Sequence, residues 1–198
     1  MKKILILAGG YSKEREISLK TAKSVFLELL NEKKYKIKII EPNGYLIKNL
    51  RKFKPEVVLN LLHGRYGEDG YIQALLESEK VKYSHSGVLS SALAMDKDLS
   101  KKIFIKNKIL TPKYIKYSFT EKIDKIKLLN KIKKKLGFPI VIKPLNEGSS
   151  VNVYICTEKN IFHYLEKVKE YGEVLLEKFI QLRGLSLEIS LSLFLVFA

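Results

Sequence analysis

Residues 4–10 read Ile-Leu-Ile-Leu-Ala-Gly-Gly, an apolar run that ends in two glycines. An apolar run of this length, bounded by a turn signal, predicts a buried strand of a parallel sheet. The two glycines permit a tight turn at the end of that strand. An apolar helical face follows over residues 19–30, and we expect Ser18 to cap the start of this helix.

The alternation of strand and helix continues to about residue 84. Further strands are expected at 35–40, 57–62 and 82–84, and further helices at 46–53 and 71–78. This order predicts a parallel, Rossmann-like sheet with helices on both faces. Ligands of such sheets bind at the carboxyl ends of the strands, so the loops 9–16 and 63–70 are the candidate binding loops.

The sequence changes character near Met95, where we place a domain boundary after residue 94. The expected elements beyond it are helices at 97–107, before Gly137 and at 158–169, and strands at 114–117, 139–143, 151–156 and 173–178. This mixture predicts a second, smaller α+β unit. The loop 146–150, Asn-Glu-Gly-Ser-Ser, connects two of its strands.

The net charge of +16, from 37 basic and 21 acidic residues, raises the possibility of a nucleic-acid partner. Only four of the basic residues are arginine, the side chain that reads guanine with a bidentate fork, and 33 are lysine. We therefore expect a lysine-rich ordinary surface and no nucleic-acid partner. A nucleic-acid-binding module stays open as an alternative that charge alone favours.

Composition also bears on location. One cysteine, Cys156, excludes an internal disulfide and fits a reducing compartment. The apolar run at the N-terminus is too short for a signal peptide, and no run reaches the ~20 residues of a membrane helix. The expectation is a cytoplasmic protein without a membrane partner.

Loop 9–16 carries four charged residues in a row, residues 13–16, where a dinucleotide fingerprint requires glycine. The loop therefore does not predict a nicotinamide site. A carboxylate here could hold a substrate ammonium group, and an ordinary solvated turn is the alternative.

Loop 63–70 holds three glycines and four ionisable side chains in eight residues. This density favours recognition of a small charged substrate, because a single histidine with two nearby acids lacks a recognised metal-ligand spacing. In the second unit, Lys143 ends a strand before Gly148 and two serines. A lysine and a small flexible loop suit nucleotide phosphates, although no Walker A pattern is present and a plain polar hairpin is the alternative.

Five strings of residues, in this order and spacing, resemble the D-alanine–D-alanine ligase family of ATP-grasp enzymes. They are Ala8–Gly10 with Glu14–Ser18, Leu62–Arg65 with Gly67–Gly70, Ser86–Val88 with Ser91–Lys97, Pro139–Pro144 with Glu147–Val151, and Leu176–Phe179. The resemblance implies an N-terminal substrate-binding domain over 1–94 and a central ATP-grasp subdomain over 95–181. It also implies that the C-terminal ATP-grasp subdomain is missing.

The resemblance assigns roles by position. Glu14 would hold the ammonium of the first D-alanine, His63 would lie near its carboxylate, Glu68 would bind substrate, and Ser149 would position the reacting amino acids. The implied ATP contacts are Lys97, Lys143, Glu147, Gly148 and Ser150 on the phosphates, and Glu177, Phe179 and Ile180 on the adenine. The implied reaction uses ATP and Mg²⁺ to form an acyl phosphate, which the second D-alanine attacks, for peptidoglycan synthesis. A homodimer is also implied.

The match breaks after Gln181, where the family has a Gly-Arg-Glu-like string. All lysines occur at or before Lys178, and no acidic residue follows Glu188. We interpret 182–198 as an aberrant remnant, frame-shifted or truncated, and expect the metal ligands in the missing part. The chain is then an incomplete ligase, inactive on its own. The alternative is another ATP-grasp ligase, or a ligase-like nucleotide-binding subunit completed by another chain.

Overall fold

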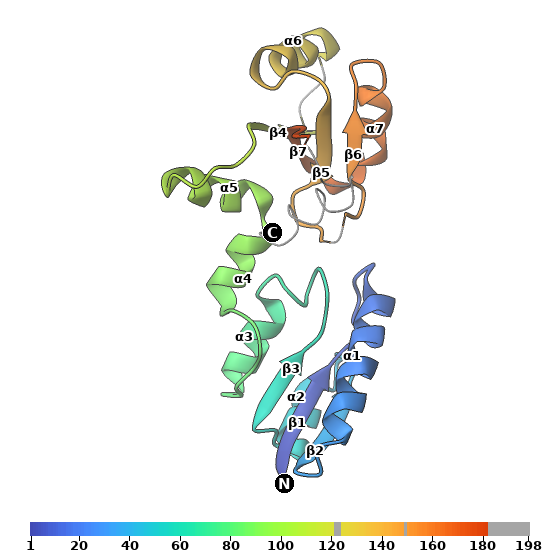
Figure 1. Ribbon diagram of the computed structural model, residues 1–198, viewed down its shortest axis with the longest axis vertical. Coiled ribbons are helices and arrows are strands. Elements are labelled where there is room, and N and C mark those ends of the chain that lie inside the picture. The colour runs from blue at the N-terminus through green and yellow to red at the C-terminus, as the bar shows by residue number, and fades with distance from the viewer. Residues whose placement is uncertain (121–123, 149, 182–198) are drawn as a thin grey trace. The chain divides into compact units, whose positions relative to one another are not determined.

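The computed structural model describes residues 1–120, 124–148 and 150–181, and the chain divides into two compact units between Leu93 and Ala94 (Figure 1). The first unit is built on a three-stranded sheet and the second on a four-stranded sheet. The segment 182–198, interpreted from sequence as an aberrant remnant, lies outside the described residues.

The first unit is a parallel α/β structure, which confirms the predicted fold class. Its elements are β1 (Lys2–Leu7), α1 (Arg15–Leu30), β2 (Tyr35–Ile40), α2 (Leu46–Phe53), β3 (Val57–Asn60), α3 (Tyr71–Ser78) and α4 (Val88–Met95). The strand order is β2-β1-β3, with both neighbours parallel to β1. The strand expected at 82–84 forms only a single bridge, between Val58 and Tyr83.

The Ile4–Leu7 part of strand β1 is apolar and buried because helices cover both of its faces. Leu5 and Leu7 pack in the cluster that includes residues of α2 and α3, whereas Ile6 packs with Ala22 of α1. Side chains alternate between the faces of a strand, so each face of β1 receives every second residue. The carboxyl ends of β1 and β3 are thereby placed side by side.

Ser18 does not cap α1, because the helix begins three residues earlier, at Arg15. Its side chain is instead fully buried. The Ser18 hydroxyl accepts a hydrogen bond from the backbone N–H of Gly9 (2.8 Å) and donates one to the carbonyl of Leu61 (2.5 Å). This one hydroxyl therefore joins the loop after β1 to the chain after β3.

The second unit is an antiparallel sheet with helices. Its elements are α5 (Lys97–Lys106), β4 (Tyr114–Ser118), α6 (Lys125–Lys135), β5 (Ile140–Pro144), β6 (Tyr154–Cys156), α7 (Ile161–Lys167), the short 3₁₀ helix η1 (Lys169–Tyr171) and β7 (Glu173–Lys178). The strand order is β4-β7-β5-β6, and every neighbouring pair is antiparallel. All four strands were predicted from sequence, but α4 was not.

The core of the second unit covers one face of its sheet. Val174 and Leu176 of β7 pack with residues of α6 and α7. Because side chains alternate along a strand, Glu177 belongs to the opposite face. Cys156 of β6 lies in the same core, fully buried, and burial raises the pKa of its thiol to about 12.

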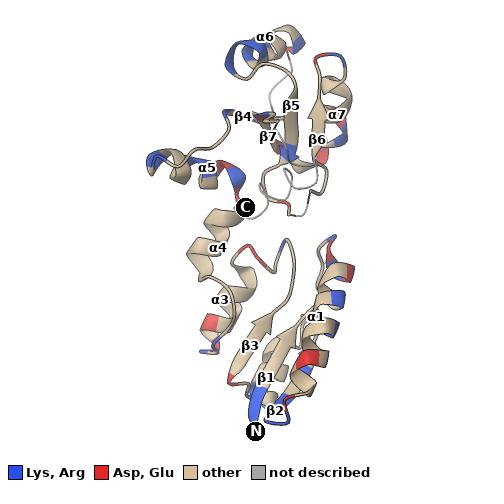
Figure 2. Cartoon of the chain, viewed as in Figure 1, with Lys and Arg blue, Asp and Glu red and all other residues tan. Residues whose placement is uncertain are grey.

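Lysine and arginine residues occur on several helices, including α1, α5, α6 and α7, rather than on one element (Figure 2). Among the described residues, no helix combines the length and the apolar character that crossing a membrane requires.

Replacing Ser18 with Ala should lower the free energy of unfolding by about 1–3 kcal/mol, because it leaves the N–H of Gly9 and the carbonyl of Leu61 buried without this partner. Urea unfolding monitored by circular dichroism measures the change. Ser24→Ala is the matched control in α1, since the exposed Ser24 hydroxyl bonds only within its own helix, to Lys20. An equal effect of both substitutions would contradict the role of Ser18.

Candidate functional site

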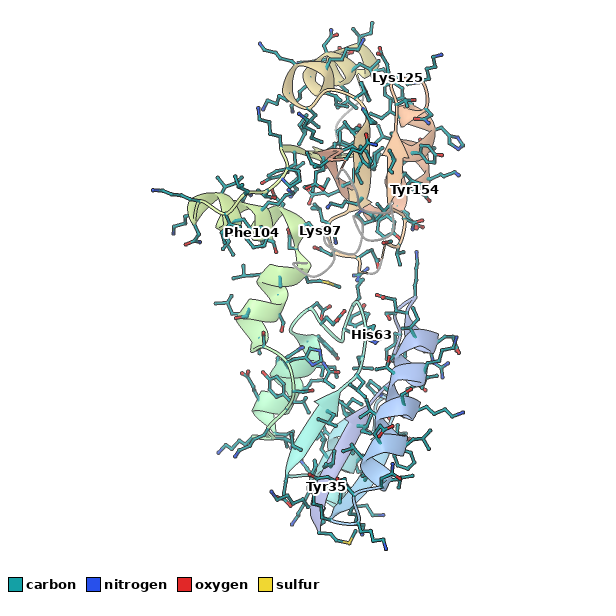
Figure 3. All side chains as sticks on the ribbon, viewed as in Figure 1. Tyr35, His63, Lys97, Phe104, Lys125 and Tyr154 are labelled. Carbon is teal, nitrogen blue, oxygen red and sulfur yellow. The ribbon has the colours of Figure 1, made fainter. Side chains whose placement is uncertain are left out.

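The residues that the sequence predicts for the site fall into two groups, one in each unit. Glu14, His63 and Glu68 belong to the first unit. Lys97, Lys143, Glu147, Gly148, Ser150, Glu177, Phe179 and Ile180 belong to the second. Figure 3 labels His63 in the loop after β3 and Lys97 at the start of α5. Ser149 lies outside the described residues.

A serine hydroxyl brings the two candidate loops of the first unit together. The Ser12 hydroxyl donates to the carbonyl of His63 (2.6 Å) and accepts from the backbone N–H of Glu14 (3.1 Å). The Glu14 carboxylate lies against Gly64, since a Cβ on Gly64 would be 2.7 Å from Glu14 Oε2. Gly64 also has a positive φ of 69°, so two constraints favour glycine there. Ser12 was not among the predicted site residues.

The imidazole of His63 lies between a hydroxyl and a carboxylate. Its Nε2 is 3.4 Å from Thr21 Oγ1, and its Nδ1 is 4.0 Å from Glu68 Oε1. The other oxygen of Glu68 accepts a hydrogen bond from the N–H of Gly64 (2.6 Å). Glu68 was predicted as a substrate contact, and in the structure its carboxylate also shapes the loop.

Two fully buried amides fix the far end of the same loop. Asn60 Nδ2 and Gln73 Nε2 both donate to the carbonyl of Gly67, at 2.8 and 3.0 Å. A Cβ on Gly67 would clash with the Cβ of Leu62, so the chain approaches itself closely here. Asn60 could have been found in the sequence, because an amide that ends an apolar strand needs a partner.

A shallow pocket of about 290 Å³, its open mouth included, lies beside these loops. Gly9 and Gly10 line it from the end of β1, and Leu62 and His63 line it from the loop after β3. It therefore lies at the carboxyl ends of parallel strands, where α/β sheets bind ligands.

In the second unit, a capping aspartate sets the start of α5. Asp96 accepts hydrogen bonds from the N–H groups of Asp98 (2.9 Å) and Leu99 (3.0 Å), which begins the helix at Lys97. Lys97 Nζ then donates to the carbonyls of Leu145 (3.4 Å) and Glu147 (2.5 Å). The first turn of α5 is thus held to the loop after β5.

The ammonium group of Lys97 is destabilised by its surroundings. Burial lowers the pKa of Lys97 to about 8, and the positive charge of Lys143 adds to this effect. An anion that approached Lys97 and Lys143 would relieve the repulsion between them.

A buried carboxylate, that of Glu177, lies beside these lysines; the residue is 3% exposed. Lys143 Nζ is 2.6 Å from Glu177 Oε2, and Lys101 forms an ion pair with Glu177 Oε1. Lys101 was missed from sequence. Its spacing was the available signal, because it follows Lys97 by four residues and so shares a face of α5.

Two backbone hydrogen bonds are present among the described residues of the loop after β5. The carbonyl of Gly148 accepts from the N–H of Val151 (3.1 Å), and that of Ser150 accepts from the N–H of Val153 (3.3 Å). Ser150 has a positive φ of 60°. The predicted phosphate loop therefore holds Lys97 through its Glu147 carbonyl, while its other phosphate contacts stay predictions.

The chain leaves β7 through the residues predicted to border adenine. The N–H of Phe179 donates to the carbonyl of Pro139 (3.3 Å), and Phe179 and Ile180 are both half-buried. In the part of the chain that the structure describes, no group of three or more His, Cys, Asp or Glu side chains could hold a metal ion.

Comparison with known proteins finds similarity to D-alanine–D-alanine ligases over most of the chain. Residues 104–192 match the family model described as D-ala D-ala ligase C-terminus, a match that runs into the segment 182–198. A D-alanine–D-alanine ligase of Pelagibacter ubique is 57% identical over 188 residues, which cover 95% of this chain and 61% of that ligase.

The chain is a relative of the D-alanine–D-alanine ligases.

Other ligases of this family agree. That of Rickettsia typhi is 39% identical over 96% of this chain and 56% of its own length. The crystal structure of the Bacillus anthracis D-alanine–D-alanine ligase is 37% identical, with a TM-score of 0.80 over 91% of this chain and 58% of that chain. The same ligase complexed with ATP gives 35% identity and a TM-score of 0.77. The chain thus has the ATP-grasp ligase fold and spans about three fifths of the length of these relatives.

Replacing Lys143 with Met should raise the pKa of Lys97 from about 8 toward its usual value, because the substitution removes a repelling positive charge. The ¹³Cε chemical shift of Lys97, followed against pH, measures this titration, and Lys97→Met assigns the signal. Lys102→Met is the control, since Lys102 is exposed and paired with Asp98. An unchanged Lys97 titration in the Lys143 variant would contradict the proximity of the two charges.

Proposed function

We propose that this chain supplies the ATP-phosphate site and the first amino-acid site for the ATP-dependent ligation of two D-alanines. The observation that carries the proposal is a group of three lysines around the Glu177 carboxylate, of which Lys101 is buried and Lys97 and Lys143 are half-buried. Positive charge gathered in a poorly solvated site favours an anionic ligand that balances it. The similarity to a ligase complexed with ATP supports a nucleotide as that ligand.

The nucleotide would be held by the second unit. Lys97 and Lys143 contact the phosphates and neutralise charge as the phosphoryl group transfers, with Glu147, Gly148 and Ser150 around them. Ser149 positions the reacting amino acids in this proposal. Glu177, Phe179 and Ile180 border the adenine. ATP supplies the phosphoryl group when bound, and these residues orient it for transfer.

The first D-alanine would be held by the first unit. The buried Glu14 carboxylate accepts its ammonium group, and His63 contacts its carboxylate, with Glu68 and Ser12 holding the loop in place. The D-alanine carboxylate attacks the γ-phosphorus of ATP and gives an acyl phosphate and ADP. The amine of the second D-alanine then attacks the acyl carbon, and inorganic phosphate leaves.

Other parts of the proposal rest on the resemblance alone. They are the use of Mg²⁺, a place in peptidoglycan synthesis, a cytoplasmic location and a homodimer. The described residues do not form a metal-binding group, so no step is assigned to a metal here.

We also propose that the first unit binds the amino-acid substrate, that the second unit binds the nucleotide, and that the 198-residue chain is inactive on its own. Phosphate release from ATP that depends on D-alanine, catalysed by the purified chain, would contradict that expectation.

Lys143→Met should weaken ATP binding by ~tenfold or more, because one charged hydrogen bond to a phosphate is lost in a poorly solvated site. Isothermal titration calorimetry of the full 198-residue chain with ATP measures the Kd. Lys102→Met is the matched control, as it removes one positive charge from an exposed side chain of α5.

The proposal predicts that the control binds ATP within about twofold of the unsubstituted chain, as for a screened surface charge. Absence of ATP binding by the unsubstituted chain would overturn the nucleotide site. Equal loss in both variants would show a general charge effect and remove the specific role of Lys143.

A further inference from the structure

Two cations share one buried carboxylate in the second unit, and they are held in different ways. Lys101 and Lys143 pair with separate oxygens of Glu177, the former with Oε1 and the latter with Oε2 at 2.6 Å. Lys101 comes from helix α5, whereas Lys143 comes from strand β5, next to β7. The Glu177 side chain is 4% exposed, so water contributes little to its charge balance.

Lys101 is anchored by groups other than Glu177. Its Nζ donates to Thr111 Oγ1 (2.5 Å) and to the carbonyl of Pro112 (2.9 Å), and it lies 5.1 Å from the ring centroid of Tyr114. Its side chain is 7% exposed. These contacts come from the segment between α5 and β4 and from β4 itself, so Lys101 cannot leave Glu177 without breaking local structure.

Lys143 is placed to interact with a ligand as well. Its side chain is 13% exposed, more than that of Lys101, and its charge repels that of Lys97. A phosphate that bridged Lys97 and Lys143 would replace this repulsion with two attractions. That contact would compete with the 2.6 Å ion pair between Lys143 and Glu177.

We propose that Lys101 is a positioning residue, the permanent counter-ion of Glu177, and that it allows Lys143 to exchange its ion pair with Glu177 for a ligand phosphate. When Lys143 turns to the phosphate, Lys101 keeps the buried carboxylate compensated. Without Lys101, the same movement would leave Glu177 as an unpaired buried charge, which is strongly unfavourable. The inference rests on the proposed nucleotide site and adds a residue and a charge exchange to it.

The test is a double-mutant cycle with inorganic tripolyphosphate, a probe that has no adenine to contact Glu177. Ligand-dependent shifts in Tm give the apparent affinity of the full chain for tripolyphosphate. The variants are Lys101→Met, Glu177→Gln and the two combined. We expect Lys101→Met to weaken binding by ~tenfold or more when Glu177 is present, and by less than ~threefold in the Glu177→Gln background, where no carboxylate is left unpaired.

Lys116→Met is the matched control, because Lys116 pairs with Glu173 in the same sheet through an exposed contact of 2.8 Å. It reports the effect of losing one positive charge from the unit. Should Lys101→Met not unfold cooperatively, Lys101→Gln makes the same test while keeping a hydrogen-bond donor toward Thr111. Lys101→Arg, which keeps the charge, should bind like the unsubstituted chain.

The outcomes are distinct. If Lys101→Met weakens tripolyphosphate binding equally with and without Glu177→Gln, Lys101 acts only through its positive charge on the ligand. That result overturns the proposed exchange of the Lys143 ion pair. A loss that grows in the Glu177→Gln background marks a purely structural role and also overturns it. If neither tripolyphosphate nor ATP shifts the Tm of the unsubstituted chain, the phosphate site itself fails, and with it the proposed function.

Discussion

Burial of the Glu177 carboxylate is the constraint on which the second unit depends. Glu177 is 3% exposed in strand β7, which lies inside its sheet, paired with β4 and β5. A carboxylate removed from water is tolerated only when cations and donors surround it. Lys143 of β5 and Lys101 of α5 meet that requirement. The ion pairs therefore join α5 to the sheet.

In the first unit, mainly neutral side chains hold the binding loops in place. Its loops must turn sharply at the ends of two buried strands, where backbone N–H and carbonyl groups lose their partners in the sheet. Ser12 and Ser18 supply hydroxyls that donate and accept at once, and Asn60 supplies an amide for the carbonyl of Gly67. Together with the Glu68 carboxylate, which accepts from the N–H of Gly64, these contacts hold the loops that carry Glu14 and His63.

The strands were largely predictable because their residues face a core. The run at β1 is apolar on both faces, and the helix over 46–53 agrees with the structure residue for residue. Ser18 was misassigned because a serine before an apolar helical face is the usual cap, whereas its hydroxyl here satisfies groups far away in sequence. Lys101 was missed for a related reason: its spacing of four residues from Lys97 places it on the same helix face, but only tertiary structure brings it to Glu177.

Cys156 has a consequence of another kind. It is the one thiol of the chain, and it lies in the core of the second unit, where burial raises its pKa to about 12. The thiolate is the form that reacts with thiol reagents. In the native protein, burial therefore protects Cys156 both by blocking access and by keeping its thiol protonated. Any event that separates β6 from β5 exposes a normal thiol. The rate at which a small alkylating reagent modifies the chain therefore records how often this sheet opens, and a ligand bound to the same unit would slow it.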